Sequence, residues 1–184
     1  SGKIDFDYMP NPNHFIRFGL GDIYHTFTPG VNQFTLQSTG SSSLDTTFGS
    51  QLHYAHELTA YVEDEFKIGS RIKGNIGLHL SGFIVGNSNY KSLQPRFSAR
   101  YLLNDKSSLK ASYASMTQFL HLLTNSGIGL PTDLWLPATS QVAPQYSKQI
   151  ALGYARTFLK KYEFSVEGYY KTMDNLIEYK DGAS

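Results

Sequence analysis

The residues best suited to chemistry in this sequence are two histidines and three adjacent carboxylates. His53 and His56 stand three positions apart in HYAH, and Glu63, Asp64 and Glu65 follow one another in VEDEF. Histidine nitrogens and carboxylate oxygens are common ligands of divalent metals. On a β-strand, however, residues three apart point to opposite faces, and Asp64 points away from its two neighbours. Surface histidines and polar strand positions therefore explain these residues better than a metal site does.

The sequence also lacks the patterns typical of disulfides, nucleophilic catalysis, phosphate binding and nucleic-acid binding. The sequence has no cysteine, which excludes disulfides and thiolate metal sites. No nucleophile stands in a recognisable set with a base, and the segments GLGD and GIGL lack the strand-to-helix context of a phosphate-binding loop. A formal net charge of +1 without basic runs gives no argument for nucleic acid. We therefore predict no enzyme, no catalytic residue, no cofactor, no bound metal and no nucleic-acid partner.

A period of two dominates the sequence and is clearest in RIKGNIGLHLSGF, residues 71–83. One parity of this segment is apolar and contains Ile72, Ile76, Leu78 and Leu80. The other parity is polar and contains Lys73, Asn75, His79 and Ser81. Such alternation predicts a β-strand with one apolar and one polar face.

The same alternation recurs along the chain and predicts about eight strands. The segments that alternate are residues 3–9, 14–20, 57–63, 71–83, 96–103, 109–115, 149–154 and 162–171. We expect an all-β fold, an antiparallel up-and-down meander. Residues 117–124 are open to a short helix within a loop, because Leu109, Tyr113, Met116 and Leu120 also fit helical spacing.

The connections between these segments alternate in length. Short turns rich in Gly, Pro, Asn, Asp and Ser are predicted at Pro10–Asn13, Lys67–Arg71, Asn104–Ser108 and Leu159–Lys161. Between them lie the long segments 28–51 and 117–145 and a connection of medium length at 85–92. All short turns then lie at one end of the sheet, as in outer-membrane barrels.

Alternation alone leaves two kinds of barrel open, because a lipocalin-like barrel points its apolar face inward and an outer-membrane barrel points it at lipid. Aromatic residues stand close to the short turns: Tyr8, Phe66, Tyr101, Phe158 and Tyr162. Aromatic girdles are typical of the membrane interface, although Tyr and Phe are also favoured in strands generally. Loop asymmetry and the aromatics together favour the membrane. The alternative is an independent small eight-stranded barrel, either in the outer membrane or lipocalin-like and soluble.

The stretch SLQPRFSARYLLNDKSSLKASYASMTQFLHLLT resembles the late barrel of a TonB-dependent outer-membrane receptor. The segments AYVEDEFKI and IKGNIGLHLSGF resemble the preceding hairpin of that family. LPTDLWLPATSQVAPQYSKQIALGY and EFSVEGYYKTMDNLIEYKDGA resemble its next segments, so the resemblance covers about residues 54–184. The order and spacing of these motifs are more specific than any one of them.

The resemblance implies a nutrient receptor in the outer membrane of a Gram-negative bacterium, with a plug domain inside a barrel of about 22 strands. Its partners would be outer-membrane lipid, TonB and a nutrient such as an iron chelate, cobalamin or a glycan. We expect residues 1–184 to be a partial β-barrel domain from the C-terminal half of such a barrel, without the plug and the remaining strands. An isolated piece of this kind is expected to self-associate through its open edges and apolar face.

This interpretation also assigns the two faces and one candidate ligand-binding loop. The apolar parity of residues 71–83 is expected to face lipid. The polar residues expected to face the lumen are Lys73, Asn75, His79, Arg96, Arg100, Glu163 and Glu167. The extracellular loop 117–145 carries the candidate ligand-facing residues Phe119, His121, Asp133 and Trp135, the last being the only tryptophan. An alternative role for Trp135 is to form the small core of that loop.

Overall fold

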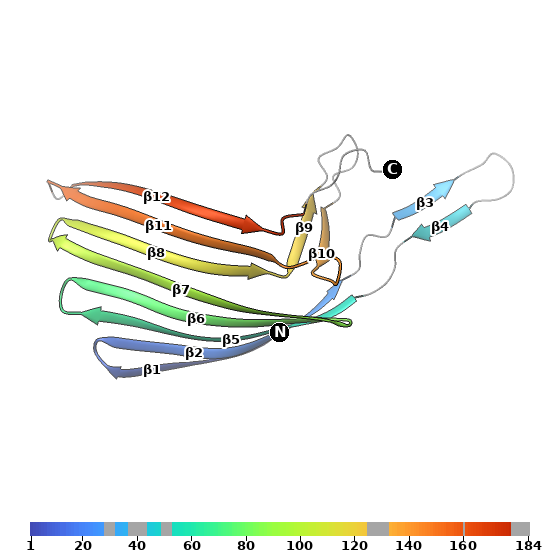
Figure 1. Cartoon of the computed structure of the whole chain (residues 1–184), viewed down its shortest axis with the longest axis horizontal. Helices are drawn as coiled ribbons and strands as arrows, with labels where there is room; N and C mark the ends of the chain where they lie inside the picture. The colour runs from blue at the N-terminus through green and yellow to red at the C-terminus, as the bar shows by residue number, and fades with distance from the viewer. Residues whose placement is uncertain (28–31, 37–43, 49–52, 125–132, 160, 178–184) are drawn as a thin grey trace.

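The computed structural model describes residues 1–27, 32–36, 44–48, 53–124, 133–159 and 161–177, and every regular element in this part of the chain is a β-strand (Figure 1). The strands are β1 (Gly2–Asn11), β2 (His14–Phe27), β3 (Asn32–Leu36), β4 (Leu44–Phe48), β5 (His53–Ile68), β6 (Ile72–Val85), β7 (Ser88–Asn104), β8 (Ser107–Gln118), β9 (Leu120–Thr124), β10 (Asp133–Pro137), β11 (Gln145–Phe158) and β12 (Tyr162–Asp174).

Eight long strands form one antiparallel sheet in the order β1-β2-β5-β6-β7-β8-β11-β12. The strands follow one another along the chain, except that the hairpins β3–β4 and β9–β10 are inserted between neighbours. This confirms the predicted eight-stranded meander. Among the described strands, β1 and β12 do not pair with each other, so the sheet stays open and the eight strands do not close on themselves (Figure 1).

The four turns predicted to be short, here called the tight turns, lie together at one end of the sheet (Figure 1). Asparagine side chains shape two of them. The carboxamide oxygen of Asn11 accepts a hydrogen bond of 2.9 Å from the N–H of Asn13, and that of Asn104 accepts one of 2.9 Å from Lys106. Such bonds to the backbone two residues on are the reason that asparagine favours turns.

One expectation about the connections is wrong. The connection predicted at 85–92 is only the pair Gly86–Asn87, because Gly86 takes a φ of +52° and Val85 pairs directly with Ser88. Of the two alternatives for residues 117–124, the short helix is not found. There β8 runs to Gln118 and β9 begins at Leu120. Pairing with β10, in which Leu122 lies opposite Trp135, satisfies the backbone of β9 and overrides the helical spacing.

The register places apolar residues in continuous rows across the sheet. One row runs Phe6, Phe18, Val62, Leu78 and Pro95, each directly paired with the next. These side chains form an apolar face that is largely uncovered; Leu78, for example, is 39% exposed. Residues of the other parity form the polar face of the same strands.

The buried core is small and lies at the end of the sheet opposite the tight turns. Its members are Phe27, Ala55, Phe83, Val85, Phe119 and Ala138. Phe83 belongs to the polar parity of β6, and its ring stacks on that of Phe119 with centroids 5.1 Å apart. The hairpin β9–β10 therefore folds back onto the polar face.

Candidate functional site

The polar face of β1, β2 and β5 carries charges that neutralise one another. Asp7, Arg17 and Glu63 are direct neighbours in one row. The Arg17 guanidinium donates to Asp7 over 3.2 Å through Nε and to Glu63 over 3.1 Å through Nη1. Charge-assisted bonds of this kind are the stronger hydrogen bonds in proteins, so the row holds its side chains in a defined arrangement.

The next row is organised around a glycine. The Tyr61 hydroxyl donates to Asp5 over 2.6 Å, and Lys3 lies 3.0 Å from the same carboxylate. Gly19 lies between Asp5 and Tyr61 in the register. A Cβ atom at Gly19 would stand 2.5 Å from the Asp5 carboxylate and 2.8 Å from the Tyr61 ring, so only glycine leaves room for this bond.

The polar residues expected to face the lumen share one face of the sheet. The register puts Lys73 beside Arg100, Asn75 beside Ser98, His79 beside Gln94, and Gly77 beside Arg96. Glu163 and Glu167 have the same parity on β12, opposite Thr157 and Gly153. Lys73 forms an ion pair with Glu65 over 2.5 Å, whereas neither Arg96 nor Arg100 pairs with a carboxylate of the described residues.

Two histidine–carboxylate pairs lie on the apolar face, and sequence reasoning missed them. His14 Nδ1 lies 2.7 Å from the Asp64 carboxylate, and His56 Nδ1 lies 3.2 Å from that of Asp22. Asp64 points away from Glu63 and Glu65, as alternation predicted. In the sequence, each of these two strands has one polar residue on either side of its run of apolar residues. The pairing itself could not be predicted, because the two partners of each pair belong to different strands. The side chain of His53 lies outside the described part of the chain.

The β9–β10 hairpin separates the candidate ligand-binding residues into two groups. Phe119 is 3% exposed and His121 is fully buried, while Trp135 is 52% exposed. The Asp133 backbone belongs to β10, and its side chain lies outside the described part. Phe119 and His121 thus hold the hairpin, and Trp135 presents its indole to the surroundings.

The hairpin is fastened to the sheet by polar contacts as well. The Tyr90 hydroxyl of β7 donates to the Thr139 carbonyl over 2.5 Å. The Ala138 N–H donates to the Phe119 carbonyl over 2.7 Å and extends the pairing of β9 with β10 by one step. Burial lowers the pKa of His121 below its ordinary value of 6.5, and the backbone at Ala143 offsets this only in part. The imidazole is therefore neutral near pH 7.

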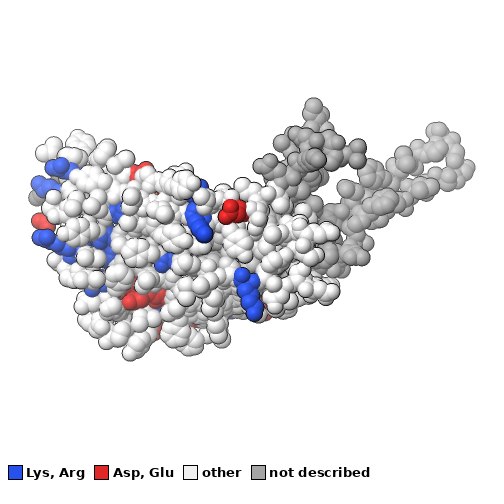
Figure 2. Space-filling model, viewed as in Figure 1, with Lys and Arg blue, Asp and Glu red and all other residues white. Residues whose placement is uncertain are grey.

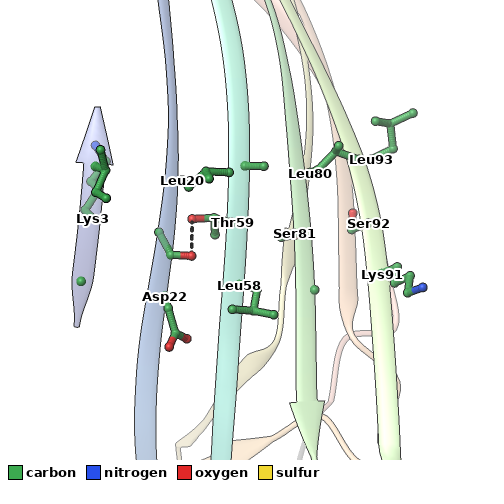
Figure 3. A pocket seen from close by; sticks show the side chains of 15 residues that line it. Lys3, Leu20, Asp22, Leu58, Thr59, Leu80, Ser81, Lys91, Ser92 and Leu93 are labelled. Atoms are coloured by element: carbon green, nitrogen blue, oxygen red, sulfur yellow. Dashed lines mark hydrogen bonds between the residues drawn. The ribbon is translucent and has the colours of Figure 1, made fainter. Parts of the chain in front are cut away.

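The apolar face has a shallow hollow of about 1020 Å³ that spans strands β1 to β7. Figure 3 shows its leucines: Leu20, Leu58, Leu80 and Leu93, from β2, β5, β6 and β7. Its floor is low because Ala60 stands between Leu20 and Leu80, and Gly82 between Leu58 and Lys91. The surface in Figure 2 is largely uncharged along the strands, and Lys and Arg gather at the end with the tight turns.

The described residues include no group of three or more His, Asp or Glu side chains placed to hold a metal ion. In the same part of the chain, no helix is long and apolar enough to cross a membrane.

Comparison with known proteins identifies a family whose model matches the whole length of the chain. No curated protein matches the chain. Similar solved structures include two of the outer-membrane protein OmpT of Vibrio cholerae. A variant lacking loop L8 has a TM-score of 0.47 at 14% identity and covers 95% of this chain. Outer-membrane expressed OmpT has a TM-score of 0.46 at 14% identity and covers 93%. The chain spans 58% and 54% of these two proteins.

The family described as TonB dependent receptor-like, beta-barrel matches residues 1–184. This match agrees with an antiparallel meander that has one apolar and one polar face. The chain belongs to the TonB-dependent receptor-like β-barrel family.

Proposed function

We propose that the chain is part of the wall of a receptor in the outer membrane of a Gram-negative bacterium, which imports a scarce nutrient with energy delivered through TonB. The family match over residues 1–184 carries this proposal. The work of such a receptor is binding and gated passage, without covalent chemistry. The nutrient classes that we propose are an iron chelate, cobalamin or a glycan.

In this proposal the apolar face contacts lipid and the polar face lines the lumen. The polar residues proposed for the lumen are Lys73, Asn75, His79, Arg96, Arg100, Glu163 and Glu167. On β2 and β5 the two histidine–carboxylate pairs bound a stretch that exposes only apolar side chains on the lipid face. A stretch of eight residues is roughly 27 Å long, and a tilt of about 40° reduces its height to roughly 20 Å. That height is close to the apolar band of about 25 Å in outer-membrane barrels.

Aromatic residues support the same orientation. The five aromatics near the tight turns all have the apolar parity: Tyr8, Phe66, Tyr101, Phe158 and Tyr162. Tyr162 is 66% exposed and Tyr8 is 57% exposed. Rings with a polar tip are stable at the lipid–water boundary, so this end of the sheet fits the periplasmic interface.

We propose that the receptor completes this sheet with further strands and a plug domain inside the lumen, so that residues 1–184 are a partial barrel domain. Two open edges and an uncovered apolar face would then make the isolated chain associate with itself. Sedimentation without detergent tests this: dimers or larger species are expected, and a monodisperse monomer would contradict it.

At the extracellular end we propose that Trp135 contacts the nutrient, together with Asp133 on the same strand. Phe119 and His121 serve this site by anchoring the hairpin to the sheet. The proposed division of roles follows from burial, because an exposed indole can stack on a ligand and a fully buried ring cannot.

Uptake by cells tests the function. A strain lacking the receptor gene should fail to take up one limiting nutrient from a panel of iron chelates, cobalamin and glycans. Expression of the receptor should restore uptake only when TonB is present. Trp135→Ala should lower uptake, whereas Tyr162→Ala, which removes an exposed aromatic at the opposite end, should preserve it. Restored uptake in a strain without TonB would contradict the proposal.

A further inference from the structure

Four cations stand side by side on the polar face near the tight turns. The register pairs Lys67 with Lys73, Lys73 with Arg100, and Arg100 with Lys110, so one row of cations crosses β5, β6, β7 and β8. Directly opposite residues on neighbouring strands have side chains about 5 Å apart on the same face. Glu65 neutralises Lys73 at 2.5 Å. Arg100 and Lys110 form no ion pair within the described residues.

This arrangement differs from the rest of the face. Like charges directly opposite each other destabilise a sheet, and opposite charges stabilise it. Between β1 and β5 the chain follows that rule, since Arg17 stands between Asp7 and Glu63. Arg100 and Lys110 break this rule, and neither forms an ion pair within the described residues, although the Glu65 and Glu167 carboxylates line the same groove. An anion bound from outside would compensate both cations.

The row borders a groove of about 400 Å³ that has suitable donors. Lys73, Arg100 and Lys110 line it together with Ser98 and Ser112, which pair directly across β7 and β8. Arginine binds carboxylate and phosphate through two parallel bonds, lysine does so as a point charge, and hydroxyls donate further bonds. The volume lies within the range of about 300–1000 Å³ that is usual for small-molecule sites.

Small residues keep the groove open on its far side. Ala151 and Gly153 of β11 stand beside Ser112 and Lys110. A Cβ atom at Gly153 would lie 3.7 Å from that of Lys110 and 3.6 Å from the Glu167 carboxylate, so a longer side chain there would fill the gap. Glu65 of β5 and Glu167 of β12 line the groove from its two outermost strands, and their negative charges disfavour an anion that extends beyond the cations.

We propose that this groove binds a small polyanion, a molecule with two or more carboxylate or phosphate groups, through Arg100, Lys110, Ser98 and Ser112. More than one anionic group is required because the two uncompensated cations belong to different strands. The site rests on the proposed function to the extent that the polar face lines the lumen of the receptor.

Calorimetric titration of the purified, folded receptor with pyrophosphate and with tricarballylate, a tricarboxylate, tests the site. We expect at least one probe to bind. The double variant Arg100→Gln/Lys110→Gln should weaken binding about tenfold or more, because it removes charged hydrogen bonds. The matched double variant Arg71→Gln/Lys106→Gln removes the same charge from the tight turns and should bind as the wild type does. Absence of binding to the wild type, or equal loss in both double variants, would overturn the proposal.

A second variant keeps all charges. Gly153→Leu should abolish binding by filling the groove, and retained affinity in this variant would overturn the site even if the charge variant fails to fold. If carboxylates of the receptor itself occupy the groove, the wild type will bind neither probe, and the proposal fails.

Nutrient uptake gives an independent result. Binding of a probe without TonB-dependent uptake would contradict the proposed function alone, and uptake without binding would contradict this site alone.

Discussion

The two faces of β2 and β5 differ in where their charged side chains lie along the strands. On the apolar face of these strands, histidines and carboxylates stand only at the two ends of the stretch from His14 to Asp22, as the pairs His14–Asp64 and Asp22–His56. On the polar face, Arg17 bridges two carboxylates midway between those ends, next to Phe18 on the other face. This difference is expected if neighbouring residues of one strand face lipid and water in turn, as we propose. Variants of the receptor test this difference and the contacts made on each face, from the largest expected effect to the smallest.

The largest effect is expected from a charge on the apolar face. Leu78→Arg should lower the free energy of unfolding by about 2–4 kcal/mol if the residue lies near the middle of the bilayer. His79→Arg, one residue along, should cost much less because its side chain points to the polar face. Folding titrations in lipid vesicles measure both variants. Equal losses, or a larger loss at His79, would show that the faces are reversed.

Next in size is the loss of a buried hydrogen bond on the polar face. Gln94 Nε2 donates to Ser81 Oγ over 2.7 Å, and both side chains are buried. Ser81→Ala leaves the carboxamide without its acceptor and should cost about 1–3 kcal/mol. Ser112→Ala, on the same face, is the control and should have little effect. The same titrations measure both, and a neutral Ser81→Ala would mean that water reaches Gln94.

A smaller effect is expected where a ring covers a glycine. A Cβ atom at Gly74 would stand 2.5 Å from the Phe66 ring, so Gly74→Ala forces this ring to turn. An off-rotamer side chain costs about 0.5–1.5 kcal/mol. Gly168→Ala is the matched control, because a Cβ atom there meets nothing within 4 Å. If both variants unfold alike in denaturant titrations, the Phe66 ring does not rest on Gly74.

The smallest effect is local and depends on pH. Burial lowers the pKa of His121 below 6.5, so the unfolded segment binds a proton more readily than the folded one. Anchoring of the hairpin is complete above pH 6.5 and weakens as the pH falls below that value. Hydrogen exchange of β9 and β10, corrected for intrinsic rates, should show more opening at pH 5 than at pH 7.5. His121→Phe should remove this difference; an unchanged difference would exclude His121 as its source.

Patterns within a few residues of one another were sufficient to predict the strands. They were not sufficient to predict contacts between segments that are far apart in the sequence. The alternation of residues 71–83 and the asparagine turns were sufficient to predict β6 and its neighbours, because both signals act within a few residues. The segment after Gly86 has the composition of a loop, because its polar residues give no sign of the pairing with β6. The burial of Phe119 and His121 was not predictable, since it depends on contacts with strands far away in the sequence.

The cation row shows the same limit for the candidate sites. Lys73, Arg100 and Lys110 are unremarkable in sequence, and only the register makes them neighbours. A strand slipped by two residues would keep every face assignment and separate these charges. The alternation of residues therefore predicted which side chains lie on the polar face. The site on that face could be identified only from the register of the paired strands.

The central claim, that adjacent residues of β6 face lipid and water in turn, can be measured directly by spin labelling. The chain has no cysteine, so single cysteines can be introduced from Ile76 to Leu80. In receptor reconstituted in lipid, labels at 76, 78 and 80 should collide mainly with oxygen, which concentrates in the bilayer. Labels at 77 and 79 should collide mainly with a water-soluble nickel complex. This alternation between oxygen and nickel accessibility supports the assignment of the two faces. The opposite alternation, or equal accessibility at all five positions, would contradict it.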